Sequence, residues 1–137
     1  MSTVPEPRLS QDEAASFKRG VEEFNRGYFF ECHDTLEDMW TGVRGPSRDF
    51  FQGLIQVSVA FYHLSNGNPA GAQSMLRRAL KRFDRYPERY FGFDLAAHRE
   101  ELTRWLDRIT SGEVVSAEAA EAPKWRFVFG SESRRSK

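Results

Sequence analysis

The chain has 137 residues, and its 20 lysines and arginines are balanced by 20 aspartates and glutamates, so the formal net charge is zero. That balance gives no overall attraction to nucleic acid or to an anionic membrane, and the length suits one domain with a real core. The single cysteine, Cys32, excludes an internal disulfide and fits a reducing compartment. No apolar run reaches the roughly 20 residues of a membrane span, and the polar, proline-containing start is unlike a secretory signal. We therefore expect a cytoplasmic protein with no membrane segment.

Two helices are predicted in the first third of the chain. Ser10 and Glu13 have the spacing of a capping box, which predicts a helix from there to about Arg26. Gly27 provides the stop, because glycine readily adopts the positive φ found after a helix. The second helix is predicted over Phe29–Trp40, with an apolar arc on one side and acidic residues on the other.

The third predicted helix, at about residues 47–65, is the centre of the expected fold. It is apolar over most of its circumference, which is typical of a helix inside a bundle. One narrow stripe is polar and carries Arg48, Gln52, Gln56 and His63. Buried polar groups need partners, since each unpaired one costs a few kcal/mol. The sequence thus predicts an all-α, compact, single-domain bundle of about five helices around this central one.

Two more helices follow. Asn68 caps a helix that starts at Pro69 and is predicted to run to about Tyr86, ahead of a proline. An aromatic loop comes next, and Asp94 then caps a fifth helix that ends near Thr110.

The predicted domain division has three parts. Residues 1–9 are expected to form a flexible arm, residues 10–112 the helical bundle, and residues 113–137 a linker with an extended tail. The alternating segment Lys124–Phe129 is expected to pack on the bundle, because its aromatic side chains would be costly to expose. Residues 131–137 are expected to be disordered.

Three motifs together carry a resemblance to a known family. The segments are FNRGYFFECHDTLEDMW at 24–40, QGLIQ at 52–56 and HLSNGNPAGA at 63–72. They are similar to the domain of unknown function 309 family, small all-helical proteins of bacteria, archaea and plants, over roughly residues 17–106. The positions that match the family pattern are Phe29, Glu31, His33, Asp34, Glu37, Trp40, Arg48, Gln52, Gln56 and His63. Asp34 stands where glutamate is commoner, and the resemblance implies a helical bundle with no established biochemical activity.

The same positions form the candidate site. Helices two and three are joined by a short loop, so we expect them to be antiparallel neighbours with their polar residues facing each other. The candidate polar pocket consists of Glu31, His33, Asp34, Glu37, Arg48, Gln52, Gln56 and His63. We interpret it as a buried hydrogen-bond network or small-ligand pocket in which Arg48 pairs with Glu37 or Asp34. A non-catalytic binding or scaffold protein follows from this interpretation.

A metal-dependent or acid–base enzyme is the alternative. His33, Glu37 and His63 could hold a divalent metal, since imidazole and carboxylate groups suit several transition metals. The spacing is neither the E-x-x-H of carboxylate-bridged bundles nor H-E-x-x-H, and Arg48 would repel a cation in the same pocket. The sequence therefore specifies no cofactor.

A second alternative rests on the fourth helix. Its outer face carries a candidate basic patch made of Arg77, Arg78, Lys81, Arg82 and Arg85. Such a patch could bind nucleic acid or an acidic partner, but no aromatic platform is interleaved with it, so nucleic acid is not favoured. His98 and Cys32 lie on apolar arcs and are expected to be structural. The aromatic loop and tail offer apolar surface on which a homodimer could form.

Overall fold

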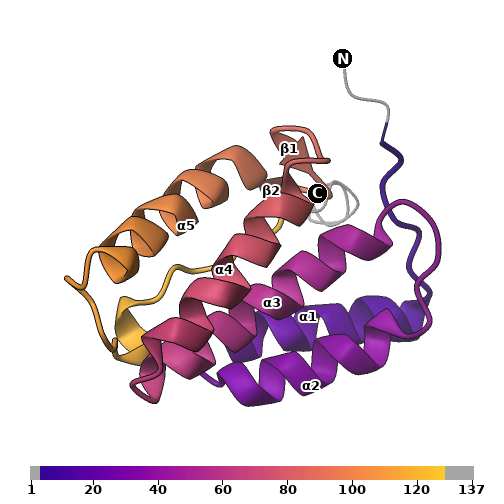
Figure 1. Cartoon of the computed structure of the whole chain (residues 1–137). Coiled ribbons are helices and arrows are strands. Elements are labelled where there is room, and N and C mark those ends of the chain that lie inside the picture. The colour runs from indigo at the N-terminus through magenta and orange to yellow at the C-terminus, as the bar shows by residue number, and fades with distance from the viewer. Residues whose placement is uncertain (1–3, 129–137) are drawn as a thin grey trace.

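The structure, a computed structural model, describes residues 4–128 and confirms an all-α bundle with five α-helices (Figure 1). The elements are α1 (Gln11–Asn25), α2 (Phe29–Trp40), α3 (Arg48–Ser65), α4 (Pro69–Phe83), β1 (Arg89–Tyr90), β2 (Phe93–Asp94), α5 (Leu95–Thr110) and a 3₁₀ turn, η1 (Ala119–Glu121). Residues 1–3 and 129–137, which include the end expected to be disordered, lie outside the described part. No helix among residues 4–128 is both long and apolar enough to span a bilayer.

The helix starts follow the predicted caps. Ser10 Oγ accepts from the Glu13 backbone N–H at 3.1 Å, and Glu13 Oε1 accepts from the Ser10 N–H at 2.9 Å. Asn68 and Asp94 cap α4 and α5 through side-chain oxygens that accept from N–H groups in the first turn. These bonds satisfy backbone donors that a helix start leaves unpaired.

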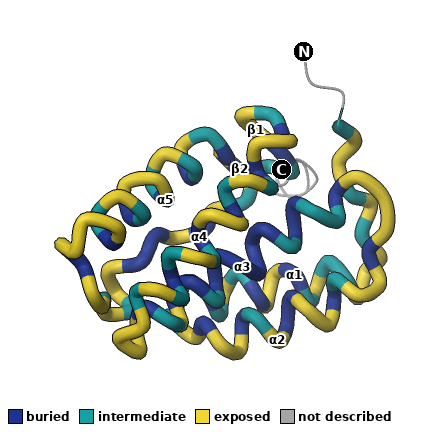
Figure 2. The backbone as a smooth tube through the Cα atoms, in the orientation of Figure 1, coloured by how far each residue is buried: buried dark blue, intermediate teal, exposed yellow. Residues whose placement is uncertain are grey.

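Helix α3 is the centre of the packing. It contacts α2 on one side and α4 on the other, while α1 packs on α2 and α5 packs on α4 (Figure 1). Buried positions concentrate on α3 and on the sides of the other helices that face the interior (Figure 2). A Cβ atom at Gly53 would lie 2.5 Å from Cε1 of Phe83, so glycine is what lets α3 and α4 approach this closely.

A short hairpin replaces the expected aromatic loop. Helix α4 ends at Phe83, three residues before the predicted end, and Tyr90 pairs with Phe93 across the β1–β2 ribbon. Phe91 and Gly92 both have positive φ, 55° and 73°, which is the backbone of a tight hairpin turn. Tyr90 donates from its hydroxyl to the Pro5 carbonyl, so the start of the described chain is tied to this hairpin.

The described part of the C-terminal segment, residues 124–128, packs on the bundle, as predicted, and Phe129 lies outside the described residues. Trp125 is 1% exposed, and its ring stacks on Phe24 with centroids 3.8 Å apart. The Trp125 backbone exchanges two hydrogen bonds with the Asn25 side chain, at 2.7 and 2.8 Å. Phe127 stacks on Phe93 in the hairpin at 4.3 Å. These rings are therefore used inside the molecule and do not supply the apolar surface on which we expected a homodimer.

Candidate functional site

One arc of α3 is partly open to solvent, and it carries the predicted polar stripe. The half-buried residues of α3 are Arg48, Asp49, Gln52, Val59 and His63. At one end of the arc, Arg48 reaches α2 through Trp40, and Asp49 reaches α4 through Arg82. The arc therefore faces outward between α2 and α4.

Neighbouring stripes of α2 and α4 extend this arc into one surface, which we call the three-helix face. On α2, residues at helical spacing approach the arc, with Phe30 5.5 Å from Tyr62 between ring centroids. On α4, Gly71 lies against the His63 ring, and the residues that follow it at helical spacing border the arc. The three-helix face consists of Phe30, His33, Glu37, Trp40, Arg48, Asp49, Gln52, Gln56, Val59, Tyr62, His63, Met75, Arg78, Arg82 and Arg85.

Arg48 contacts the Trp40 ring and backbone carbonyls at the start of the α2–α3 loop, and it does not pair with an acidic side chain. Its guanidinium carbon lies 3.7 Å from the centroid of the Trp40 ring. Its Nη1 donates to the carbonyl oxygens of Trp40 at 3.0 Å and Val43 at 2.7 Å. The predicted pairing of Arg48 with Glu37 or Asp34 is wrong, because the guanidinium donates instead to one carbonyl at the end of α2 and one in the loop that follows it.

His33 has carboxylates beside it, but the group is not enclosed. Its Nε2 lies 3.5 Å from Glu37 Oε2, and its Nδ1 lies 3.3 Å from Asp34 Oδ1 without the geometry of a hydrogen bond. The Asp34 and Glu37 side chains are 62% and 51% exposed. Glu31 is exposed and points about 100° or more away from His33 and Glu37 around α2, by helical spacing. The polar cluster therefore lies at the surface and not in the buried network that we expected.

The best-connected polar group of the face centres on Asp49, which the sequence analysis missed. Asp49 pairs with both Arg82 and Arg85 of α4. Arg82 also donates from Nε to Gln56 Oε1 at 3.2 Å, and Gln56 is buried. The signal in the sequence was the spacing of Asp49, Gln56 and His63, each seven residues apart on one side of the helix.

Gln52 is the unsatisfied member of the stripe. Its Oε1 is buried and has no hydrogen-bond partner among residues 4–128. A buried acceptor without a donor costs about 1–3 kcal/mol. The three-helix face therefore contains a hydrogen-bonding position that the folded chain itself leaves open.

The proposed metal ligands are not brought together. His63 faces Asn68, with 3.3 Å between its Nδ1 and the Asn68 Nδ2. The rings of Phe30 and Tyr62 stand between His63 and His33, each within 6 Å of the histidine beside it. Within the described residues, no group of three or more histidine, cysteine, aspartate or glutamate side chains is placed to hold a metal ion.

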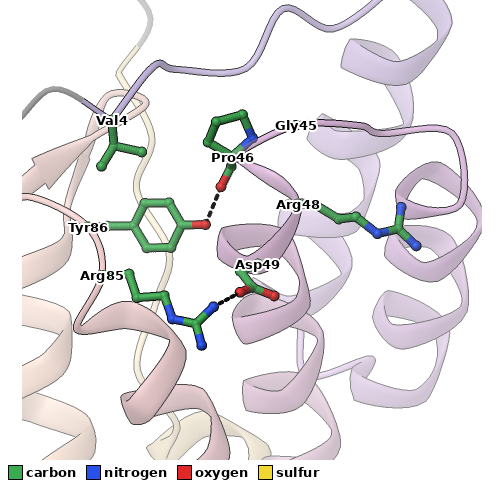
Figure 3. Close-up of a pocket in the computed structure, with 7 residues that line it drawn as sticks. All are labelled: Val4, Gly45, Pro46, Arg48, Asp49, Arg85 and Tyr86. Carbon is green, nitrogen blue, oxygen red and sulfur yellow. Dashed lines mark hydrogen bonds and ion pairs between the residues drawn. The ribbon is translucent and has the colours of Figure 1, made fainter.

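A hollow of about 450 Å³ lies at one end of the face, where α3 begins (Figure 3). Arg85 and Asp49 form an ion pair on its wall, and Tyr86 donates from its hydroxyl to the Pro46 carbonyl. The Arg48 guanidinium extends away from these groups, toward α2. The charges of Asp49 and Arg85 therefore largely neutralise each other, so the hollow is distinguished by its shape more than by its charge.

The predicted basic patch is divided by these pairings. Arg82 and Arg85 are bound to Asp49, while Arg77, Arg78 and Lys81 are exposed. No ion pair of these three is found within the described residues. The free positive charge is thus smaller than the sequence suggested.

Two side chains expected to be structural are buried in the core and are not part of the face. Burial, with the negative charge of Glu23, raises the pKa of the Cys32 thiol well above its usual range, so it stays protonated. Burial lowers the pKa of His98 to about 3, so its imidazole is neutral near pH 7. His98 Nε2 has no hydrogen-bond partner among residues 4–128.

Comparison with known proteins matches a family profile to a segment that includes most of the face. Residues 17–75 match the sequence profile of DUF309, a domain of unknown function. The chain is 26% identical over 95 residues to an uncharacterized protein of Aquifex aeolicus (strain VF5), a match that covers 69% of this chain and 28% of that protein. It is 35% identical over 54 residues to the uncharacterized protein YpuF of Bacillus subtilis (strain 168), covering 39% of this chain and 31% of YpuF. The chain thus matches less than a third of the length of either relative.

The matched segment begins within α1 and ends within α4 at Met75. It includes the α2 and α3 parts of the three-helix face and leaves out Arg78, Arg82 and Arg85 of α4. It is shorter than the resemblance expected from the motifs, which extended to about residue 106. Residues 17–75 are thus similar to the DUF309 profile, in agreement with the resemblance that the motifs carried.

Proposed function

We propose that the chain is a non-catalytic binding domain and that the three-helix face is where it docks another protein. The observation that carries the proposal is a pair of large aromatic side chains left at the surface in mutual contact. Phe30 is 51% exposed and Tyr62 is 38% exposed, whereas the rings in the interior are almost completely covered.

The surroundings of this pair support a protein partner. Trp40 and Arg48 stack at the other end of the face, and aromatic and arginine side chains are enriched where proteins bind each other. An extended surface of mixed aromatic, amide and charged groups suits a macromolecule better than a small molecule, which usually binds in a concave pocket.

The test is site-specific photocrosslinking in the source organism's cells. A photoreactive phenylalanine analogue at position 62 should give discrete protein adducts, and the same analogue at position 115 should not. Val115 is a matched control because it is 60% exposed and lies outside the face. Phe30→Ala in the position-62 variant should weaken the adducts. Equal adducts at the two positions, or none at position 62, would contradict the proposal.

A further inference from the structure

We infer that the partner on the three-helix face is a second copy of this chain, docked about a two-fold axis that runs along α3, with α2 of each copy against α4 of the other. The inference rests on the proposed function, since it names the protein that covers the same face. It depends on how charge and apolar groups are distributed across that face.

Charge is separated between the two helices that flank α3. Helix α2 carries Glu31, Asp34, Glu37 and Asp38 and no lysine or arginine. Helix α4 carries Arg77, Arg78, Lys81 and Arg82 and no aspartate or glutamate. Of these charges, Glu37 lies on the three-helix face with Asp34 beside it, and Arg78 lies on the face with Lys81 beside it, so the face has an acidic border on α2 and a basic border on α4. A surface of this kind is complementary to a copy of itself in one arrangement only.

That arrangement is fixed by symmetry. Most homodimers have two-fold symmetry, in which the same surface of both copies forms the interface. An axis perpendicular to α3 within the interface would place α2 on α2 and acid on acid. An axis along α3 places α2 of one copy on α4 of the other, which pairs acid with base at both edges.

The register along the helices is also complementary. Tyr62 and His63 are neighbours on α3, and they touch Phe30 of α2 on one side and Gly71 of α4 on the other. At the opposite end, Arg48 and Asp49 touch Trp40 and Arg82. Residues 30–40 of α2 are therefore level with residues 71–82 of α4.

A two-fold axis along α3 preserves these levels, so each group of α2 meets groups of α4 that lie within about one turn of its own height. Phe30, one turn from the level of Gly71, comes near the half-buried Met75 of the second copy. Asp34 comes near Arg78, and Glu37 comes near Lys81. Apolar groups thus meet apolar groups, and opposite charges meet, without any change in the fold.

The test is the mass of the full chain in solution, measured by analytical ultracentrifugation across a concentration series. The wild-type chain should be in monomer–dimer equilibrium. Asp34→Lys with Glu37→Lys should weaken the dimer by about 100-fold or more, since like charges facing each other cost several kcal/mol. Arg78→Glu with Lys81→Glu should do the same. An equimolar mixture of the two double variants should form a mixed dimer, because both edges are then complementary again.

A matched control reverses two charges elsewhere. Glu100→Lys with Asp107→Lys alters exposed residues of α5 and should leave the dimer unchanged. Circular dichroism melts of all variants should match the wild type, since the altered side chains are exposed. A dimer that survives both reversed pairs, or a mixture that stays monomeric, would overturn the inference.

The outcomes separate the two proposals. A chain that is monomeric at every concentration but gives adducts with other proteins from position 62 would overturn the dimer and leave the binding face standing. A monomer without such adducts would overturn both.

Discussion

Arg48 lies over the indole of Trp40 and bonds to the carbonyl oxygen of the same residue, so one guanidinium serves both the ring and the backbone at the end of α2. Trp40 returns a bond from its Nε1 to the Arg48 carbonyl at 3.0 Å. The two residues therefore fix the turn between α2 and α3, and with it the width of the three-helix face.

Arg48→Lys should destabilise the fold although it keeps the charge. An ammonium group cannot reach two carbonyls and stack on the ring at once, so we expect a loss of about 1–2 kcal/mol in the free energy of unfolding. Urea denaturation measures this loss. Arg78→Lys, on an exposed part of α4, is the control and should stay within about 0.5 kcal/mol of the wild type. Equal stability of the two variants would show that the Arg48 contacts contribute nothing.

Glu37→Ala should change stability by no more than about 0.5 kcal/mol, because the carboxylate is half exposed and its contact with His33 is screened by water. A buried network would have required a much larger loss. A thermal melt that falls by ten degrees or more, on the order expected for a few kcal/mol in a domain of this size, would restore the buried network that the sequence suggested.

Gly53→Ala should destabilise the bundle by about 1–3 kcal/mol, since the added methyl group would overlap the buried Phe83 ring and force helices apart. Gly42→Ala is the control, because the nearest atom there belongs to the flexible Glu13 side chain at 3.1 Å. Calorimetry of both variants checks the difference. A Gly53 variant as stable as the Gly42 variant would mean that α3 and α4 pack less closely than described.

Trp125→Ala should cost about 3–5 kcal/mol, because the ring is buried against Phe24 and its removal leaves a large cavity. Val128→Ala, at an exposed position of the same segment, should have almost no effect. Chemical denaturation of the two variants measures the contrast. Similar small losses for both would show that the segment is not part of the core.

His98 should make the fold less stable in mild acid. Its pKa in the folded state is about 3, below the 6.5 of an unfolded chain, so the unfolded state binds more protons between those values. Stability from this group is complete above about pH 6.5 and falls as the pH drops toward 3. Between pH 7 and pH 5 the loss should be about 2 kcal/mol. His98→Leu should remove this part of the pH dependence whatever its own stability, and an unchanged slope would contradict the buried, neutral imidazole.

The fold was largely readable from the sequence because its signals are local. Capping residues such as Ser10 and Asn68 and the apolar spacing of α3 fix where helices begin and which are central. The path of the C-terminal segment was only partly readable, because the bonds between Asn25 and Trp125 join residues 100 positions apart. Nothing local to either residue specifies the other.

The sequence predicted which residues of α3 share one polar stripe, but it did not predict which residues of α2 and α4 lie beside that stripe. Helical spacing orders residues around α3 and does not say which arc its neighbours cover. Gln56 and Gln52 were placed correctly on one stripe, but Asp49 was overlooked because its partners Arg82 and Arg85 come from a distant helix. Arg48 was misassigned because carboxylates are visible in a sequence and the free carbonyls at a helix end are not.

The two hydrogen bonds between Asn25 and Trp125 also have a consequence for how the protein folds during translation. A ribosome produces all five α-helices before it reaches Trp125, and until then the Phe24 ring lacks its stacked neighbour and the Asn25 amide lacks its backbone partner. The growing polypeptide therefore leaves its interior incomplete until translation has passed that tryptophan. A stalled nascent chain that ends before Trp125 would expose an apolar gap in its core to chaperones and proteases.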